Sequence, residues 1–385
     1  MAETFDVVVL GGGTGGYSCA LRAAGLGLSV ALVEKAKVGG TCLHWGCIPT
    51  KAFLHAAEVA EHAKHGPDLG VKSAFDGVDI DKVIGYKNGI VDANWKGLQA
   101  TLKGRGVTTF NGHGTLTGPN TISVETDSGS VDVEATKAFV LATGSRPKTL
   151  PFAEVDGELV ITSDEAMYME RVPSRPIVLG ASAVGVEFAT VWNGYGADEV
   201  TIIEAMDAVV PLEDIDTQKT LKRELKKNGI TAMTGEFVEK GDGTVTVTTK
   251  SGKTVEGDLL MLAIGRGPVT DGMNIEATGV TLDRGFITVD EYCRTGVTFG
   301  DGGVVYAIGD VIPTLGLAHA SFMEGMLVAN QVAGEPVTPI DYRGVPKVYY
   351  CTPEIGAVGY TEQELKEEGI EFDAKKFPFS HNARA

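Results

Sequence analysis

Cysteine is scarce in this chain, with five residues among 385. So few cysteines in a chain this long exclude a small secreted scaffold held together by a disulfide framework. The odd number fits a reducing compartment in which one pair carries out redox chemistry. The cysteine content therefore predicts an intracellular protein.

Positive charge is also in short supply. Against 51 Asp and Glu there are only 33 Lys and Arg, and the formal net charge is −18. Because Lys and Arg form no cluster, we expect no binding to nucleic acid and none to an anionic membrane. The sequence also lacks an apolar run of membrane-spanning length, and its N-terminus lacks the features of a secretory signal. These absences predict a cytoplasmic protein.

The chain is long enough for two or three domains, and it opens with a complete pattern for dinucleotide binding. A strand, a glycine turn, a helix of small residues and a second strand follow one another within residues 5–34. Gly11, Gly13 and Gly16 fill the three glycine positions of the fingerprint, and Glu34 ends the second strand. This context predicts a turn that approaches a pyrophosphate and a carboxylate that binds a ribose.

The same pattern returns within residues 176–204. Gly180 and Gly185 fill two glycine positions, but Ser182 stands at the middle one, which predicts a working site with a less close fit. Glu204 ends the second strand, and a carboxylate there accepts from a ribose 2′-hydroxyl and repels a 2′-phosphate. We therefore expect NAD rather than NADP in this unit.

Two cysteines, Cys42 and Cys47, follow the first unit five residues apart. Residues so spaced on a helix lie roughly 8.7 Å apart between Cα atoms, whereas a disulfide needs less than about 7 Å. A bridge would require an interrupted helix or a loop, for which Gly46 supplies backbone freedom. Lys51, one turn further on, and a helix N-terminus would favour a thiolate.

Two other interpretations of these cysteines stay open: ordinary buried residues, or half of a zinc site. Zinc sites usually show closer spacing and further Cys or His ligands, and the other cysteines are isolated in the sequence. We therefore favour a redox pair and predict no metal.

Other segments have recognisable local patterns. Apolar runs at 138–144 and 259–265 end on glycine, residues 81–102 have the pattern of a long helix, and 121–125 alternates like an exposed antiparallel strand. Thr361 to Glu364 forms a capping box that predicts the start of a short helix.

With two nucleotide units and a Cys-x4-Cys pair in this order, the chain resembles the pyridine nucleotide-disulfide oxidoreductases, and within them the lipoamide branch. The resemblance rests on Gly-Gly-Thr-Cys-Leu-x-x-Gly-Cys-Ile-Pro-Thr-Lys at 39–51, Ala142-Thr-Gly-Ser145, Gly185-Val-Glu187-Phe, Ala263-Ile-Gly-Arg266, Ala307-Ile-Gly-Asp310 and Leu317-Ala-His-Ala320.

The resemblance implies an α/β fold with two Rossmann-like dinucleotide-binding domains of the three-layer ββα type and a partial α+β interface domain. It implies an FAD-binding domain made of residues 1–149 and 270–346, an NAD-binding domain at 150–269, and an incomplete interface or dimerisation domain at 347–385.

It also implies residue roles. Cys42 would exchange with the substrate, Cys47 would contact the flavin, and Lys51, paired with Glu187, would tune the charge there. The implied FAD-binding residues are Gly11, Gly13, Thr14, Gly16, Glu34, Lys35, Gly40, Thr41, Cys42, Lys51, Gly114, Thr143, Gly144, Ser145, Asp310 and Ala318. The implied NAD-binding residues are Gly180, Ser182, Ala183, Val184, Gly185, Glu187, Glu204, Phe237, Gly265 and Arg266.

The implied activity is reoxidation of protein-bound dihydrolipoyl groups through the Cys42–Cys47 pair and FAD, with NAD⁺ as acceptor. The implied partners are the lipoyl domain of an acyltransferase or glycine-cleavage complex and a second copy of the chain. Alternatives are another FAD-dependent disulfide reductase, of mercuric or mycothiol type, and a flavin diaphorase.

The family's proton acceptor is a histidine in a His-Pro dipeptide near the C-terminus, and none of the seven histidines here precedes proline. The last residues resemble the first part of the family's interface domain, so we expect a C-terminally truncated member. For the 385 residues as given, this predicts slow lipoamide turnover and a weakened homodimer.

Overall fold

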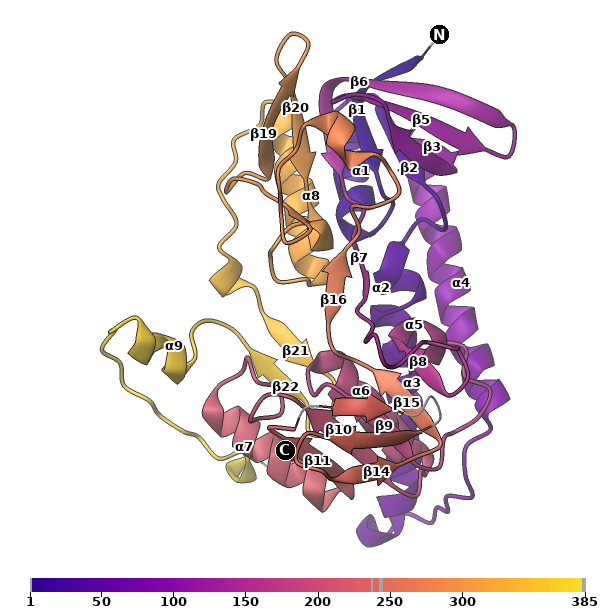
Figure 1. Cartoon of the computed structure of the whole chain (residues 1–385), viewed down its shortest axis with the longest axis vertical. Helices are drawn as coiled ribbons and strands as arrows, with labels where there is room; N and C mark the ends of the chain where they lie inside the picture. Colours follow the sequence, from indigo (N-terminus) through magenta and orange to yellow (C-terminus); the bar gives the residue numbers. More distant parts are fainter. Residues whose placement is uncertain (1, 237, 242–244, 383–385) are drawn as a thin grey trace.

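The computed structural model describes residues 2–236, 238–241 and 245–382. Two largely parallel sheets lie at opposite ends of its long axis (Figure 1). Helix α4 (Ile80–Gly104) runs along one side of the molecule, and the strand pair β7 (Ser145–Pro147) and β16 (Arg266–Pro268) lies between the sheets. The predicted α/β class is confirmed.

The first sheet is built around β1, whose apolar residues from Val7 to Leu10 are buried between two parallel neighbours. In spatial order its strands are β19 (Arg294–Phe299), β20 (Gly303–Ala307), β6 (Gly129–Leu141), β1 (Glu3–Leu10), β2 (Val30–Glu34) and β3 (Thr108–Asn111). The antiparallel strands β4 (His113–Leu116) and β5 (Thr121–Thr126) join it through β6.

Two helices, α1 (Thr14–Gly25) and α8 (Ala318–Val332), pack against each other beside this sheet. They cross closely because Gly325 has no side chain: a Cβ there would lie 2.5 Å from the carbonyl oxygen of Gly15. Strand β5 is not simply exposed, as its sequence suggested, because Ile122 and Val124 are fully buried in the core of this unit.

The second sheet repeats the arrangement. Its strands, in spatial order, are β11 (Ile230–Thr234), β10 (Val200–Glu204), β9 (Pro176–Leu179), β15 (Leu259–Leu262) and β8 (Val160–Thr162). Its helices are α5 (Ser163–Ala166), α6 (Ala183–Tyr195) and α7 (Ile215–Lys227), and a separate antiparallel sheet contains β12 (Val238–Gly241), β13 (Thr246–Thr249) and β14 (Thr254–Glu256). Each sheet therefore carries one strand–turn–helix–strand unit of the kind predicted.

The remaining elements connect or follow these units. They are α2 (Gly40–His44), α3 (Cys47–His65), β17 (Leu282–Asp283), β18 (Phe286–Ile287), β21 (Lys347–Tyr349), β22 (Ile355–Ala357), α9 (Glu362–Glu367) and the short 3₁₀ helices η1 (Gly66–Leu69), η2 (Ile275–Thr278), η3 (Gly309–Val311), η4 (Tyr342–Gly344) and η5 (Phe379–His381). The predicted capping box is confirmed: Thr361 Oγ1 accepts from the backbone N–H of Glu364, and the Glu364 carboxylate accepts from that of Thr361.

The chain enters the second sheet after β7 and leaves it through β16, and the segment from Val345 to Asn382 lies beside the second sheet. Among the described residues, no helix combines the length and the apolar character needed to cross a bilayer.

Candidate redox and dinucleotide site

The two cysteines lie on either side of a helix break. Cys42 belongs to α2, which ends at His44, and Cys47 is the first residue of α3. Gly46 makes the break, with φ −145° and ψ −109°. The sequence prediction of an interrupted helix is therefore confirmed, and both cysteines are free thiols.

The environment separates the acidities of the two thiols. The hydrogen bond from Cys42 lowers the pKa of Cys47, burial opposes this, and the Lys51 ammonium and the helix N-terminus lower it further. The same hydrogen bond, together with burial, raises the pKa of Cys42. Both effects favour a thiolate at Cys47 over one at Cys42.

Lys51 and Glu187 join the two units at this point. The Lys51 Nζ lies 2.7 Å from Glu187 Oε2, so the pairing suggested by the resemblance is present. Glu187, on α6, is only 4% exposed, and its other oxygen accepts from the backbone N–H of Tyr350 at 3.0 Å. The carboxylate is thus held from two sides, and the ammonium stands one helical turn from Cys47.

The first glycine turn leaves room for a ligand at one position only. A Cβ on Gly11, where φ is 107°, would lie 2.2 Å from Ala142 O, and one on Gly16 would lie 1.8 Å from Gly11 O. By contrast, a Cβ on Gly13 would meet no atom within 4 Å. This open space at the N-terminus of α1 fits a pyrophosphate.

The segment from Gly39 to Cys47, which we call the redox loop, is held against this turn. The Gly39 N–H donates to Gly12 O at 2.7 Å, and a Cβ on Gly40 would lie 2.7 Å from Gly13 Cα. Glu34 also faces the turn, because its carboxylate accepts from Gly12 N–H at 2.7 Å. The thiol pair and the proposed nucleotide site are therefore one connected structure.

The second turn has the same geometry despite its serine. Ser182 (φ −82°, ψ −172°) and Gly13 (φ −71°, ψ −173°) share one backbone conformation at the N-caps of α6 and α1. Gly180 has φ 104°, and Glu204 accepts from Ala181 N–H at 2.7 Å. Serine fits this turn without strain, and its side chain occupies space that stays open at Gly13.

A third group of predicted residues meets between the sheets. Ser145 Oγ donates to Asp310 Oδ2 at 2.6 Å, and Arg266 Nε donates to Ser145 Oγ at 2.8 Å. The Arg266 guanidinium also donates to Thr41 Oγ1 at 3.4 Å. This arginine therefore binds protein groups around the end of the redox loop.

Four of the other predicted residues stand at helix starts: Thr14 begins α1, Ala318 begins α8, and Ala183 and Val184 begin α6. Gly144 and Gly265 have positive φ and lie beside open space, whereas a Cβ on Gly114, in β4, would meet Ile122. Lys35 is exposed after β2, Thr143 donates to Val269 O, and Phe237 lies outside the described residues.

Two contributors had no role assigned from the sequence, although Glu324 belongs to a stretch that carries the family resemblance. Tyr350 contacts both members of the Lys51–Glu187 pair. Glu324, fully buried on α8, accepts from the Gly309 N–H at 2.6 Å and so holds the turn that carries Asp310. A glutamate in the apolar stretch of α8 was the available signal for the second, since buried carboxylates need partners.

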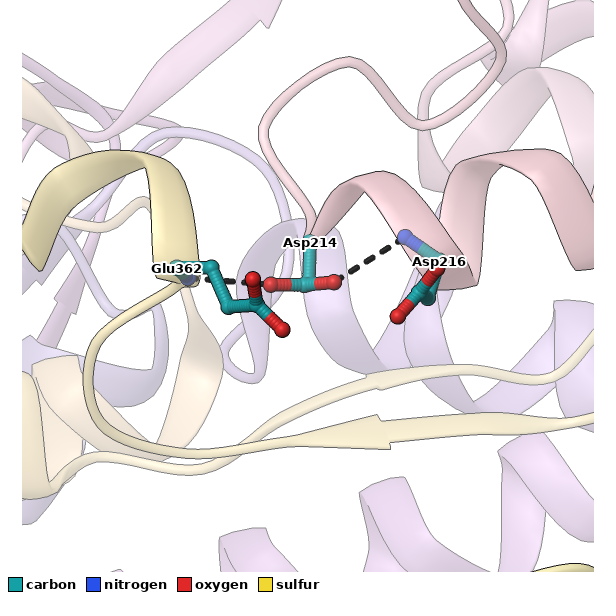
Figure 2. Close-up of side chains that lie close together, drawn as sticks. All are labelled: Asp214, Asp216 and Glu362. Atoms are coloured by element: carbon teal, nitrogen blue, oxygen red, sulfur yellow. Dashed lines mark hydrogen bonds between the residues drawn. The ribbon is translucent and has the colours of Figure 1, made fainter. Parts of the chain in front are cut away.

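One acidic cluster lies away from this site. Asp214, Asp216 and Glu362 bring carboxylate oxygens close together (Figure 2). Asp214 accepts from the backbone N–H groups of both Asp216 and Glu362, while Lys376 pairs with Asp216 and Lys366 with Glu362. These contacts explain the cluster as a joint between α7 and α9.

Comparison with known proteins gives consistent matches. The family model described as pyridine nucleotide-disulphide oxidoreductase matches residues 5–325, and that family's dimerisation domain matches residues 345–385. The chain is 40% identical to a dihydrolipoyl dehydrogenase of Bacillus subtilis (strain 168), covering 98% of this chain and 82% of the relative. It is 38% identical to the mitochondrial dihydrolipoyl dehydrogenase of Pisum sativum, covering 99% and 77%. The crystal structure of LpdA from Mycobacterium tuberculosis superposes with a TM-score of 0.88 at 28% identity, covering 98% and 83%.

Proposed function

Because the chain belongs to the pyridine nucleotide-disulphide oxidoreductase family, we propose that it oxidises protein-bound dihydrolipoyl groups at Cys42 and Cys47. Members of this family use FAD and NAD. The observation that carries the proposal is the Cys42–Cys47 pair at a helix break, fastened to a glycine turn with open space at Gly13.

The residues that would hold FAD surround the first turn. The N-terminus of α1 and Gly13 would face the pyrophosphate, Glu34 a ribose, and Asp310, oriented by Ser145, the ribityl chain. Ser182, the N-terminus of α6 and Glu204 would hold NAD in the same manner. When bound, FAD supplies the two-electron chemistry that links the thiol pair to NAD.

The chain's own residues perform the thiol exchange. A substrate thiolate attacks Cys42 Sγ of the oxidised pair, the Cys42–Cys47 bond breaks, and Cys47 leaves as a thiolate. The second substrate thiol then gives up its proton and attacks the substrate sulfur joined to Cys42, and the bond between that sulfur and Cys42 breaks. Cys42 takes up one proton as a thiol, the substrate departs as a disulfide, and its two electrons stay on the cysteines. The lowered pKa of Cys47 makes it the better leaving group, and Lys51 stabilises its charge.

Two further expectations extend the proposal. The partner that delivers the substrate would be a lipoyl-bearing protein, as the names of the relatives indicate. A homodimer is supported by the match of residues 345–385 to the family's dimerisation domain.

The test compares wild type with Cys42→Ser in single half-reactions rather than in steady-state turnover. These 385 residues contain no His-Pro dipeptide, so slow lipoamide turnover is expected of both proteins. Anaerobic dihydrolipoamide should reduce the Cys42–Cys47 pair of the wild-type protein and produce a long-wavelength band between the new thiolate and the oxidised flavin. Cys42→Ser should lose this reduction yet still pass electrons from NADH to a dye. Equal reduction of both proteins by dihydrolipoamide would contradict the thiol mechanism and leave a diaphorase.

A further inference from the structure

The Lys51 ammonium has a second neighbour, supplied by a segment about 300 residues further along the chain. It lies 4.7 Å from the ring centroid of Tyr350, within the range of a cation–π contact. Tyr350 is the residue that follows β21. Tyr349, the last residue of the strand, turns into the second unit, where its hydroxyl donates to Glu213 Oε1 at 2.7 Å, whereas the Tyr350 ring lies against the Lys51 ammonium.

We infer that Tyr350 is a positioning residue, whose ring holds the Lys51 ammonium beside Cys47 and so keeps the thiolate accessible at neutral pH. The segment that matches the dimerisation domain thereby adjusts the chemistry of the redox pair. The inference rests on the proposed function and adds a residue to it.

The geometry explains why a ring is needed in addition to Glu187. The Lys51 side chain is 35% exposed, so its flexible stem can reach water if nothing covers it. Glu187 fixes one side of the ammonium, and the Tyr350 ring covers another. The Glu187 carboxylate itself accepts from the backbone N–H of Tyr350, a bond that survives replacement of the side chain. Substitutions at Tyr350 therefore test the ring alone.

Among the described residues, the titratable groups that act on Cys47 or on which it acts come from four elements packed around it. Cys42 on α2 and Lys51 on α3 favour its thiolate, and Glu187 on α6 opposes it. Tyr17 on α1 stays neutral, because burial, followed by the two cysteines, raises its pKa to about 12. The Lys51 ammonium is the one cation of this set, and loss of its contact would raise the pKa of Cys47.

The experiment is a pH titration of the thiolate-to-flavin band in the reduced holoenzyme. Tyr350→Leu should move the midpoint up by roughly half a pH unit, and Tyr350→Met should do the same. Tyr350→Phe, which keeps the ring, should titrate like wild type. The matched control is Tyr360→Leu, which removes a ring 3.8 Å from Arg343 in the same segment and should change nothing.

A double mutant shows whether the effect passes through the lysine. Tyr350→Leu should add no further shift to Lys51→Met. Either an unshifted Tyr350→Leu protein or a shift in Tyr350→Phe equal to that in Tyr350→Leu would overturn the inference. Absence of the band from reduced wild type would instead overturn the proposed function, so the two failures are distinguishable.

Discussion

At the scale of single residues, the carboxylates that end β2 and β10 are oriented by their own chain. Each accepts one backbone N–H from the glycine turn and one from the residue two places further on. Glu34 and Glu204 are therefore fixed before a ligand arrives, which reduces the entropy lost on binding.

Glu204→Gln tests the nicotinamide preference. We expect the KM for NADH to rise about tenfold, because hydrogen bonds to a charged acceptor are worth more than those to an amide. The preference for NADH over NADPH should narrow, since the charge that repels a 2′-phosphate is gone. Steady-state dye reduction with both nucleotides measures this, with exposed Glu199→Gln as the matched control. An unchanged ratio of the two KM values would argue against a ribose contact.

The sequence could predict residues whose position follows from a local pattern, but not those brought in from afar. Glu34 and Glu204 each end a strand after a glycine turn, and the two cysteines lie only five residues apart. Tyr350 reaches Lys51 only because β21 docks on the second unit through Glu213, and no local signal encodes that docking. Arg266 also has partners from two distant elements, α2 and β7.

At the scale of elements, the two strand–turn–helix units were predictable because apolar runs, glycine spacing and terminal acids all lie within about 30 residues. The helix break between α2 and α3 followed from disulfide geometry. The prediction that β5 is exposed was wrong for one of its two faces. Its side chains alternate, and those of Ile122 and Val124 are buried.

At the first glycine turn, an effect of a substitution on flavin binding can be separated from an effect on folding. Gly13→Ala places a Cβ in open space at φ −71°, so the apoprotein should unfold at nearly the wild-type temperature. Its flavin content should nevertheless fall severalfold, because the methyl group occupies the room for the pyrophosphate. The control is Gly25→Ala at the other end of α1, which also meets open space and should keep its flavin. Full flavin content in Gly13→Ala would refute this role.

Helix α4 carries a buried lysine that makes stability depend on pH. Lys87 is 3% exposed, and its Nζ donates to Met167 O at 3.0 Å. Burial lowers the pKa of Lys87, whereas the unfolded chain titrates near the ordinary value of about 10.4. The unfolded state therefore binds more protons between these two values, and the contribution of Lys87 to stability rises as pH increases through that window.

Lys87→Met removes this dependence. The unfolding free energy of wild type relative to the variant should increase as the pH is raised from about 7 to about 10. Urea denaturation across this range measures the difference in unfolding free energy. For exposed Lys96→Met on the same helix, that difference should not change with pH. Parallel curves for wild type and Lys87→Met would show that the ammonium is not penalised by burial.

At the scale of the whole molecule, one guanidinium connects the parts that must cooperate. Arg266 lies on β16, where the chain leaves the second unit, and it donates to the hydroxyl and the carbonyl of Ser145 at 2.8 Å each. It also reaches Thr41, the residue before Cys42, and Ser145 in turn donates to Asp310. The orientation of the second unit relative to the redox loop therefore depends on a planar group with several fixed donors.

Arg266→Met should slow electron delivery without weakening nucleotide binding. Because the second glycine turn and Glu204 are untouched, the Kd for NADH should stay within about twofold of the wild-type value. The limiting rate of flavin reduction should fall about tenfold, because small displacements of reacting groups are costly. Stopped-flow reduction at increasing NADH separates the two quantities. Arg266→Lys should recover part of the rate, since an ammonium can replace only some of the donors, and exposed Arg223→Met on α7 should behave like wild type. A lost affinity at an unchanged limiting rate would instead place Arg266 in direct contact with the nucleotide.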